Sequence, residues 1–172
     1  MAPASVNLAT LVLDFDSTFT KVEALDVLAE QLFASDPARL TDLKAIKDLT
    51  ELAMSGEIGF GEALQRRVQI LKPSRSDIEA LTEALKEQVS ASIERNRKVF
   101  EENPGKIRII SGGFHEFIEP VVAAFGIRPE HVLANRLVFD ETGVAVGVDQ
   151  DNPLSKDGGK IVALRSWADL SG

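Results

Sequence analysis

The chain has 172 residues and a net charge of −8, and it contains no cysteine. The negative balance disfavours a nucleic-acid partner, because binding to phosphates requires an excess of positive charge. The lack of cysteine excludes disulfides, thiolate nucleophiles and zinc–thiolate centres. The sequence has no stretch of membrane-spanning length and no signal-peptide pattern at its start, so we expect a cytoplasmic protein without a membrane partner.

The stretch around which the chain is organised is LATLVLDFDSTFTKVE, residues 8–23. Its first part, 8–13, is an apolar and β-prone run, which is typical of a strand buried on both faces in a parallel sheet. Asp14 and Asp16 follow at the carboxyl end of that strand, where ligands bind in open α/β sheets. Two carboxylates this close repel each other, so one holds a proton or both share a cation, for which Mg²⁺ is the natural choice.

Apolar residues then recur at helical spacing, which predicts helices over 22–33, 40–54, 60–71 and 76–100. Ser76, with Glu79 three residues later, indicates a capping box at the start of the last helix. No convincing strand interrupts this region. We therefore expect a helical cap over 20–90, inserted into an α/β core that consists of 1–19 and 91–172.

The second half of the chain alternates strands and helices. Strands are predicted over 106–110 and 132–133, a hairpin over 137–139 and 144–148, and helices over 115–125 and 160–167. Ser111-Gly112-Gly113 follows the first of these strands, where glycines let the backbone approach an anion and the next helix N-terminus favours negative charge. The expected fold is α/β, with a Rossmann-like, three-layer α/β/α core around a parallel sheet.

The motif DFDST at the end of a buried strand resembles motif I of the haloacid-dehalogenase-type phosphatases. The resemblance implies Asp14 as the nucleophile, Asp16 as the general acid and base, and both as part of a Mg²⁺ site. An aspartyl-phosphate intermediate and a protonated leaving alcohol suit these two groups. Two solvated loop acids would explain Asp-x-Asp alone equally well, so the interpretation depends on Ser17 and Thr18 completing the motif.

Two further motifs of that family have counterparts here. Ser111 stands at the end of the second core strand, where a Ser or Thr would donate a hydrogen bond to phosphoryl oxygens. The third motif is a lysine near the start of a later helix, met by Lys160 or Lys156. We prefer Lys160, because it directly precedes the apolar helix. This lysine would neutralise charge on the nucleophile and the phosphoryl group.

Four segments together are similar to the phosphoserine phosphatase family: DFDSTFTKVEALDVLAE, GEIGFGEALQRRVQIL, IRIISGGFHEFI and ANRLVF. This resemblance implies phosphoserine, a small phosphorylated metabolite of serine biosynthesis, as the substrate. Glu23 would bind its ammonium group and Arg67 its carboxylate, in keeping with their charges. Met54 and Phe60 would shield the substrate, and Gly112 would contact its phosphate or serine part.

The family's fourth motif is a strand that ends in Gly-Asp and supplies another Mg²⁺ ligand. It has no counterpart here, and Asp169 near the end of the sequence lacks the Gly-Asp pattern. We therefore expect a C-terminal segment or a second chain to complete the core, with weak Mg²⁺ binding in its absence. Two alternatives stay open: a phosphatase or phosphotransferase for another small phosphate ester, and a catalytically silent fragment.

Overall fold

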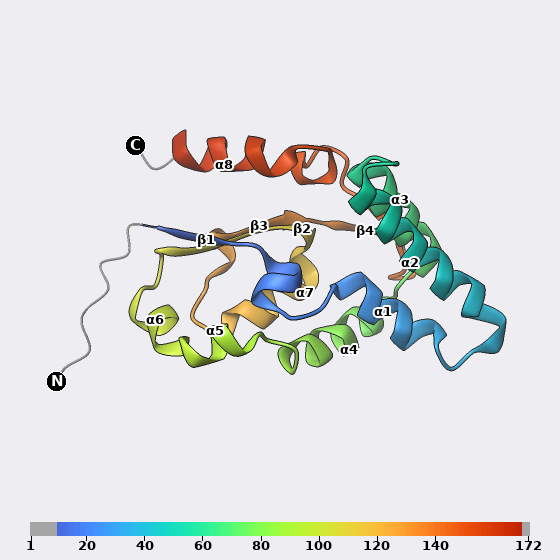
Figure 1. The fold of residues 1–172 in the computed structure, drawn as a ribbon, viewed down its shortest axis with the longest axis horizontal. Helices are drawn as coiled ribbons and strands as arrows, with labels where there is room; N and C mark the ends of the chain where they lie inside the picture. The colour runs from blue at the N-terminus through green and yellow to red at the C-terminus, as the bar shows by residue number, and fades with distance from the viewer. Residues whose placement is uncertain (1–9, 170–172) are drawn as a thin grey trace.

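A three-stranded parallel sheet lies at the centre of the computed structural model, which describes residues 10–169 (Figure 1). The strands are, in order across the sheet, β1 (Leu11–Leu13), β2 (Ile107–Phe114) and β3 (Val132–Asn135). β4 (Leu137–Phe139) and β5 (Ala145–Val148) form an antiparallel pair. The predicted parallel sheet and hairpin are both confirmed, while residues 8 and 9 of the first predicted strand lie outside the described range.

The register of the sheet places the functional segments side by side. Leu11 pairs with Ile107 and Leu13 with Ile109, so the carboxyl ends of β1 and β2 meet at one edge of the sheet. β2 continues through Ser111-Gly112-Gly113 to Phe114, with an irregular register against β3 after Ile110. The predicted end of this strand at residue 110 was therefore too early. Asp14 and the glycine pair therefore lie at the same edge of the sheet, as the positions of the two motifs at strand ends predict.

Helices cover both faces of the sheet. In chain order, the α-helices of the described residues are α1 (Ala24–Phe33), α2 (Leu40–Ser55), α3 (Phe60–Leu71), α4 (Arg75–Lys86), α5 (Ala91–Arg95), α6 (Arg97–Glu102), α7 (His115–Ala123) and α8 (Gly159–Asp169). α8 lies over one face, where Ala163 packs with Ile110 and Leu154 (Figure 1). α7 lies on the opposite face and belongs to the main core. Among the described residues, no helix combines the length and apolar character of a membrane span.

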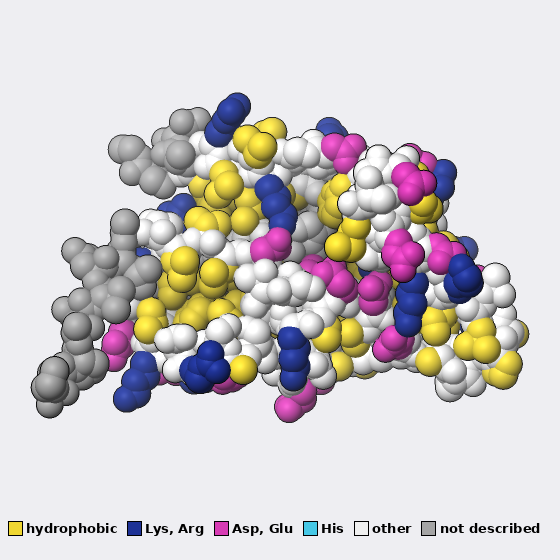
Figure 2. All heavy atoms as spheres, viewed as in Figure 1, with side chains coloured by type: hydrophobic (Ala, Val, Ile, Leu, Met, Phe, Trp, Pro, Cys, Tyr) yellow, Lys and Arg dark blue, Asp and Glu magenta, His cyan; other side chains and the backbone are white. Residues whose placement is uncertain are grey.

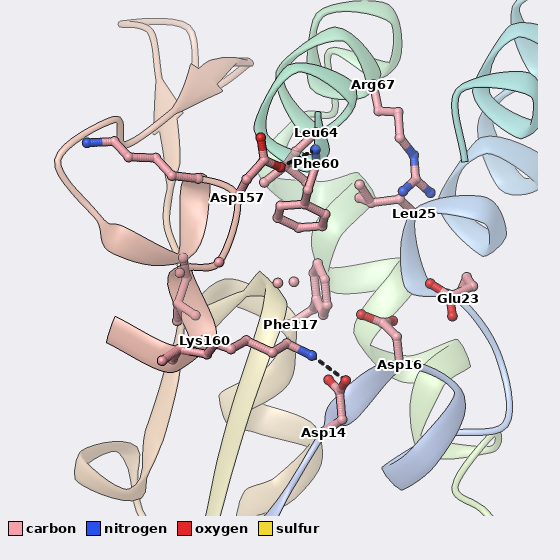
Figure 3. A pocket seen from close by; sticks show the side chains of 17 residues that line it. Asp14, Asp16, Glu23, Leu25, Phe60, Leu64, Arg67, Phe117, Asp157 and Lys160 are labelled. Carbon is pink, nitrogen blue, oxygen red and sulfur yellow. Dashed lines mark hydrogen bonds and ion pairs between the residues drawn. The ribbon is translucent and has the colours of Figure 1, made fainter. Parts of the chain in front are cut away.

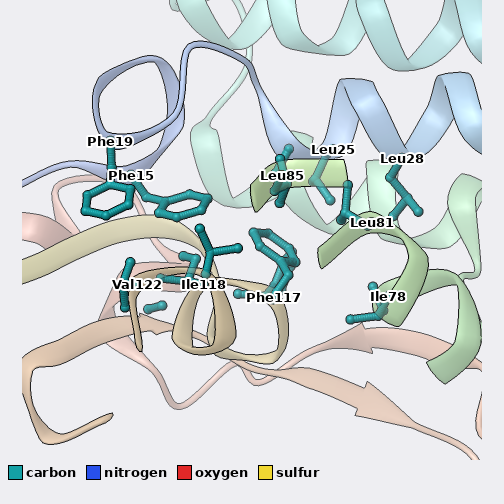
Figure 4. Packing of buried hydrophobic residues seen from close by; sticks show 14 of the residues in the cluster. Phe15, Phe19, Leu25, Leu28, Ile78, Leu81, Leu85, Phe117, Ile118 and Val122 are labelled. Atoms are coloured by element: carbon teal, nitrogen blue, oxygen red, sulfur yellow. The ribbon is translucent and has the colours of Figure 1, made fainter. Parts of the chain in front are cut away.

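Buried phenylalanine rings anchor the turn that follows β1. Phe15 and Phe19 are fully buried, and their rings stack with centroids 5.9 Å apart (Figure 4). Phe19 also meets the ring of Phe125 edge-on at 5.1 Å, and Phe15 meets Phe117 of α7 at 6.1 Å. Each buried ring contributes roughly 2–3 kcal/mol of apolar burial. The core therefore holds this turn rigidly, together with Asp16 between the two rings in sequence.

α1, α2 and α3 lie together beyond one end of the sheet (Figure 1). α1 packs against α2 and α4, and α3 packs against α2 and β5. α4 also packs against α7, so it connects these helices with the layer that covers the sheet. The predicted division into a cap over 20–90 and a core on either side of it stays a prediction.

The predicted continuous helix over 76–100 is wrong, because α4, α5 and α6 replace it. Between α4 and α5 the backbone runs beside the turn after β1. The N–H of Lys21 donates to the carbonyl of Gln88 at 2.9 Å, and the N–H of Ser90 donates to the carbonyl of Phe19 at 2.9 Å. These tertiary hydrogen bonds replace the helical ones, and apolar spacing along the chain carries no information about them.

The capping box of α4 lies two residues earlier than predicted. Ser74 Oγ accepts from the N–H of Asp77 at 3.3 Å, and Asp77 Oδ2 accepts from the N–H of Ser74 at 2.8 Å. The segment SRSDIE contains a serine followed by an acid three residues later twice, so the pattern alone is ambiguous. The structure shows the extended backbone of an N-cap at Ser74, with φ −77° and ψ 168°.

We predict that Ser74→Ala lowers the free energy of unfolding by about 1 kcal/mol, because the hydroxyl that accepts from the N–H of Asp77 and donates to Asp77 Oδ2 is lost. Ser76→Ala is the matched control. Ser76 Oγ makes one exposed hydrogen bond, to Ser74 Oγ at 2.9 Å, and caps no backbone N–H, so we expect a loss within about 0.5 kcal/mol. Urea unfolding curves of both variants measure the difference, and a larger loss for Ser76→Ala would contradict the observed cap.

Candidate active site

A cavity of about 390 Å³ opens at the carboxyl edge of the sheet (Figure 3). Its wall is built from the turn after β1, the glycine pair of β2, the first turns of α3 and the segment that leads into α8. The volume suits a small ligand. Its charged lining residues are Asp14, Asp16, Glu23, Arg67, Lys156, Asp157 and Lys160, and its larger apolar lining residues are Leu25, Phe60, Leu64, Phe117, Leu154 and Ile161.

Asp14 follows β1 directly and has both carboxylate oxygens engaged. Oδ1 accepts from the N–H of Phe15 at 2.8 Å, which fixes the carboxylate at the start of the turn. Oδ2 forms an ion pair with Lys160 Nζ of α8, and both side chains remain partly exposed (Figure 3). Lys160 thus brings its charge to the carboxylate from a helix 146 positions later in the sequence. The carboxylate is oriented and neutralised but not sealed from the cavity.

Asp16 lies deeper and in a different electrostatic environment. Burial raises the pKa of its carboxyl from 3.8 to about 7. The N–H of Ala24, which donates to Asp16 Oδ1 at 2.8 Å, opposes this rise, while the charges of Glu23 and Asp14 add to it. A carboxyl group with a pKa near 7 can hold a proton or release it at neutral pH, which is what a general acid and base must do. The two neighbouring acids therefore lie in different surroundings, Asp14 beside the charge of Lys160 and Asp16 in a buried position.

The turn that carries Asp16 contains a strained residue. Ser17 has φ +53°, a left-handed conformation that non-glycine residues rarely adopt. Ser17 Oγ donates to Glu23 Oε1 at 2.7 Å, and the N–H of Ser17 donates to the carbonyl of Val22 at 3.2 Å. Strain of this kind persists where surrounding structure enforces it, often at functional sites. Here the hydrogen bonds of Ser17 join the turn after β1 to Glu23 at the start of α1.

Arg67 reaches the cavity from α3 and is nearly buried, with its side chain 11% exposed. One terminal nitrogen, Nη2, donates to Asp26 Oδ1 at 2.7 Å. Burial lowers the pKa of Arg67, and the charges of Asp26, Asp16 and Glu23 oppose this effect. Its Nε is buried and has no hydrogen-bond partner in the part of the chain that the structure describes. The described residues therefore satisfy only part of the hydrogen-bonding capacity of the guanidinium.

The glycines of β2 form the floor of the cavity. Ser111 is fully buried, and its Oγ accepts from the N–H of Gly113 at 2.9 Å. A Cβ on Gly113 would lie 3.2 Å from Ser111 Oγ and 3.3 Å from Asp16 Oδ2, so the hydroxyl and the carboxyl both approach this glycine. A Cβ on Gly112 would lie 2.5 Å from the ring of Phe60, which closes over the glycine from α3. Larger residues would fill this floor.

The structure brings most of the predicted site residues to one cavity. The lining includes Asp14, Asp16, Glu23, Phe60, Arg67, Gly112, Lys156 and Lys160. Of the two candidate lysines, Lys160 is the one paired with Asp14. Ser111 lies behind the lining and reaches it through Gly113. Met54 is 84% exposed near the end of α2 and is not among the lining residues, so the structure does not bring it to the cavity. The chemical roles of all these residues stay predictions.

Sequence reasoning missed three polar residues that support the site. Asp26 pairs with Arg67, and Asp157 Oδ1 accepts from the N–H of Phe60 at 2.5 Å. Buried Asn135 at the end of β3 donates to the carbonyls of Gly112 at 2.9 Å and Leu154 at 3.0 Å. Asn135 lies within ANRLVF, one of the segments on which the family resemblance rests, and that resemblance was the available signal for a role at the site. Asp26 likewise lies within the quoted segment DFDSTFTKVEALDVLAE, whereas Asp157 lies in none of the quoted segments and gave no signal, because acids in loops are common.

The carboxylates of the cavity provide only part of a binding site for a hard cation such as Mg²⁺. The described residues contain no group of three or more His, Cys, Asp and Glu side chains placed to hold a metal ion. Asp14 and Asp16 do share the cavity, and the negative charge of Asp14 is one cause of the raised pKa of Asp16. Mg²⁺ commonly takes one or two protein carboxylates and completes its shell with waters and substrate phosphates. The additional segment or second chain expected from the sequence stays a prediction.

Comparison with known proteins assigns the chain to one family. The model of the haloacid dehalogenase-like hydrolases matches residues 11–172. The chain belongs to this hydrolase family. Its structure is similar to that of a phosphoserine phosphohydrolase-like protein from Francisella tularensis, with a TM-score of 0.78 and 27% identity over 94% of this chain and 73% of that one. A phosphoserine phosphatase solved as an analogue of its phospho-aspartyl intermediate has a TM-score of 0.76 and 23% identity, covering 95% and 72%, and shows the same fold.

Curated relatives of this haloacid dehalogenase-like hydrolase include phosphoserine phosphatases. The chain is 36% identical over 152 residues to the chloroplastic enzyme of Arabidopsis thaliana, covering 88% of this chain and 49% of that protein. It is 34% identical over 160 residues to the enzyme of Mus musculus, covering 88% and 64%. It is 32% identical over 169 residues to that of Streptococcus thermophilus, covering 94% and 69%. The chain thus spans about half to two thirds of the length of these relatives.

We predict that Asp16→Asn stabilises the metal-free chain at pH 8 by about 1–3 kcal/mol. The folded-state pKa of about 7 lies above the ordinary value of 3.8, so the folded chain binds the proton more tightly than the unfolded chain. Folding therefore loses stability as the pH rises from 3.8 to about 7, and the amide, which keeps an acceptor for Ala24, removes this loss.

Urea unfolding in the presence of a chelator at pH 4 and pH 8 measures the effect of this substitution. The gain should be largest at pH 8 and close to zero at pH 4. A stability difference that does not change with pH would contradict the assigned environment of Asp16.

Proposed function

We propose that this hydrolase cleaves the phosphate ester of phosphoserine through an aspartyl-phosphate on Asp14. The observation that supports this most is the pairing in one cavity of two unlike carboxyl groups: Asp14, ion-paired with Lys160, and Asp16, with a pKa of about 7. Phosphoryl transfer to a carboxylate requires a nucleophile that is ionised and oriented, and a separate acid for the leaving alcohol. The names of the relatives supply the substrate class.

In the proposed first step, a carboxylate oxygen of Asp14 attacks phosphorus while the bond from phosphorus to the serine oxygen breaks. The proton of Asp16 goes to that oxygen, so serine leaves as the alcohol. In the second step, Asp16 takes a proton from water, and the water oxygen displaces Asp14 from phosphorus to give phosphate. Lys160 offsets the negative charge that builds up on the nucleophile and the phosphoryl oxygens.

Mg²⁺ is the cofactor that we propose for this site. The Asp14 carboxylate and the Asp16 backbone carbonyl would hold it together with the substrate phosphate and waters. When bound, it neutralises phosphoryl charge and aligns the ester for in-line displacement. Gly112 and Gly113 line the cavity beside Ser111 and add no side chain there, so the phosphate would lie against their backbone.

The serine end of the substrate would lie toward α1 and α3. Glu23, held by Ser17, offers a carboxylate for the ammonium group. Arg67 lines the same cavity and offers its guanidinium to the carboxylate, and an arginine fork suits a carboxylate in geometry as well as charge. Phe60, at the start of α3, would shield the serine part of the substrate from water. The cytoplasmic location stays a prediction.

We predict that Asp14→Asn abolishes phosphoserine turnover, because an amide oxygen is too poor a nucleophile to form the acyl phosphate. Phosphate release with saturating Mg²⁺ measures the loss, and intact-mass analysis of quenched reactions detects phosphorylated enzyme. Retention of more than about a tenth of the activity, equivalent to about 1.4 kcal/mol of barrier, would rule out the nucleophilic role.

We predict that Arg67→Ala lowers kcat/KM for phosphoserine by roughly 100-fold and for p-nitrophenyl phosphate by less than about tenfold, because only phosphoserine carries a carboxylate. Arg66→Ala is the matched control. Arg66 pairs with Glu62 at 2.6 Å on the exposed side of α3, so it should change neither substrate by more than about threefold. Equal losses on both substrates with Arg67→Ala would mean that Arg67 supports the fold or the phosphate instead.

A further inference from the structure

We infer that Asp157 is a positioning residue that holds the start of α3 against the segment leading into α8, and so keeps Phe60 and Arg67 in place over the cavity. This inference rests on the proposed function only where it concerns the substrate. The contact itself is structural. Asp157 Oδ1 accepts from the N–H of Phe60 at 2.5 Å, across 97 positions of sequence.

The first turn of α3 lacks a local cap. Its N-cap residue is Gly59, which has no side chain to accept from the free N–H groups of the turn. Such groups carry partial positive charge, and an acceptor on a negative side chain is the preferred partner. Asp157 supplies that acceptor from a distant loop. A capping interaction that would normally be internal to a helix therefore joins two separate parts of the molecule.

The backbones on either side of this hydrogen bond are in close contact. A Cβ on Gly61 would lie 2.4 Å from the carbonyl oxygen of Ser155, and a Cβ on Gly59 would lie 2.6 Å from Asp157 Oδ2. Only glycine permits such an approach. The start of α3 thus packs directly against residues 155–157, and Asp157 provides the polar contact between them.

Both sides of the contact carry proposed active-site residues. On α3, Phe60 is the residue whose N–H is held, and Arg67 lies seven positions later on the same helical face. On the other side, Lys160 follows Asp157 by three residues and pairs with Asp14. Figure 3 shows Asp157 between the start of α3 and the segment that bears Lys160, with the ring of Phe60 pointing into the cavity. Loss of this contact would release α3 while leaving the Asp14 and Lys160 pair intact.

The residue acts through Phe60 and Arg67, so its loss should affect the serine end of the substrate and spare the phosphate end. Asp157→Ala should raise KM for phosphoserine roughly tenfold, the ratio expected from one lost capping bond. Turnover of p-nitrophenyl phosphate and kcat for phosphoserine should change by less than about threefold. Asp157→Asn keeps an acceptor oxygen for Phe60 and should restore KM to within about threefold of the wild type.

The test combines steady-state kinetics with hydrogen exchange of the Phe60 amide, measured on the wild type, Asp157→Ala, Asp157→Asn and the control Asp151→Ala. Asp151 is exposed in the preceding loop. The Phe60 amide should exchange roughly tenfold faster in Asp157→Ala and at the wild-type rate in the other two variants.

Unchanged exchange in Asp157→Ala would overturn the inference, whatever the activity. Faster exchange with equal losses on both substrates would also overturn it, because Asp157 would then only stabilise the fold. If the wild type did not turn over phosphoserine, the proposed function would fail. The exchange rates would in that case still decide whether Asp157 holds α3.

Discussion

Two carboxyl groups at the end of one strand cannot both be ionised cheaply in the same cavity, and the rest of the site is arranged around that constraint. Asp14 is neutralised by the charge of Lys160, while burial raises the pKa of Asp16 to about 7. One acid thus has a cation beside it, while the other can hold or release a proton near neutral pH, so the two groups are accommodated in the cavity in two different ways. The same separation provides a nucleophile and an acid, which phosphate-ester hydrolysis through a covalent intermediate requires.

The fold supports this arrangement by making the turn after β1 rigid. Phe15 and Phe19 flank Asp16 in sequence and are fully buried, so the core fixes the turn on both sides of the acid. Ser17 can then be kept at φ +53° and can hold Glu23 at 2.7 Å. Backbone hydrogen bonds between residues 88–90 and residues 19–21 support the turn further. These contacts explain why the helical pattern that follows α4 is interrupted.

The sequence sufficed to predict the parts of the molecule that depend on local order. DFDST after an apolar run predicted a strand with acids at its end, and the glycine pair predicted a second strand meeting the same edge. Contacts between residues far apart in the chain could not be predicted from it. The break after Lys86 depends on hydrogen bonds to Phe19 and Lys21, and the cap at Phe60 depends on Asp157. Nothing in a helical repeat or a short acid motif records which remote donor an acid will meet, or that Met54 will lie on the surface.

The acids of the site have a second role that unites these observations. Asp16 accepts from the N–H of Ala24, the first residue of α1, and Asp157 accepts from the N–H of Phe60, the first residue of α3. In both helices the first N–H is thus bound by a carboxyl group that lines the cavity and belongs to a loop at the edge of the sheet. The helices that carry Arg67 and its partner Asp26 are therefore oriented by the same residues that surround the reacting groups. Since a helix start favours negative charge, any change in the charge at this edge also changes how firmly the two helices are held.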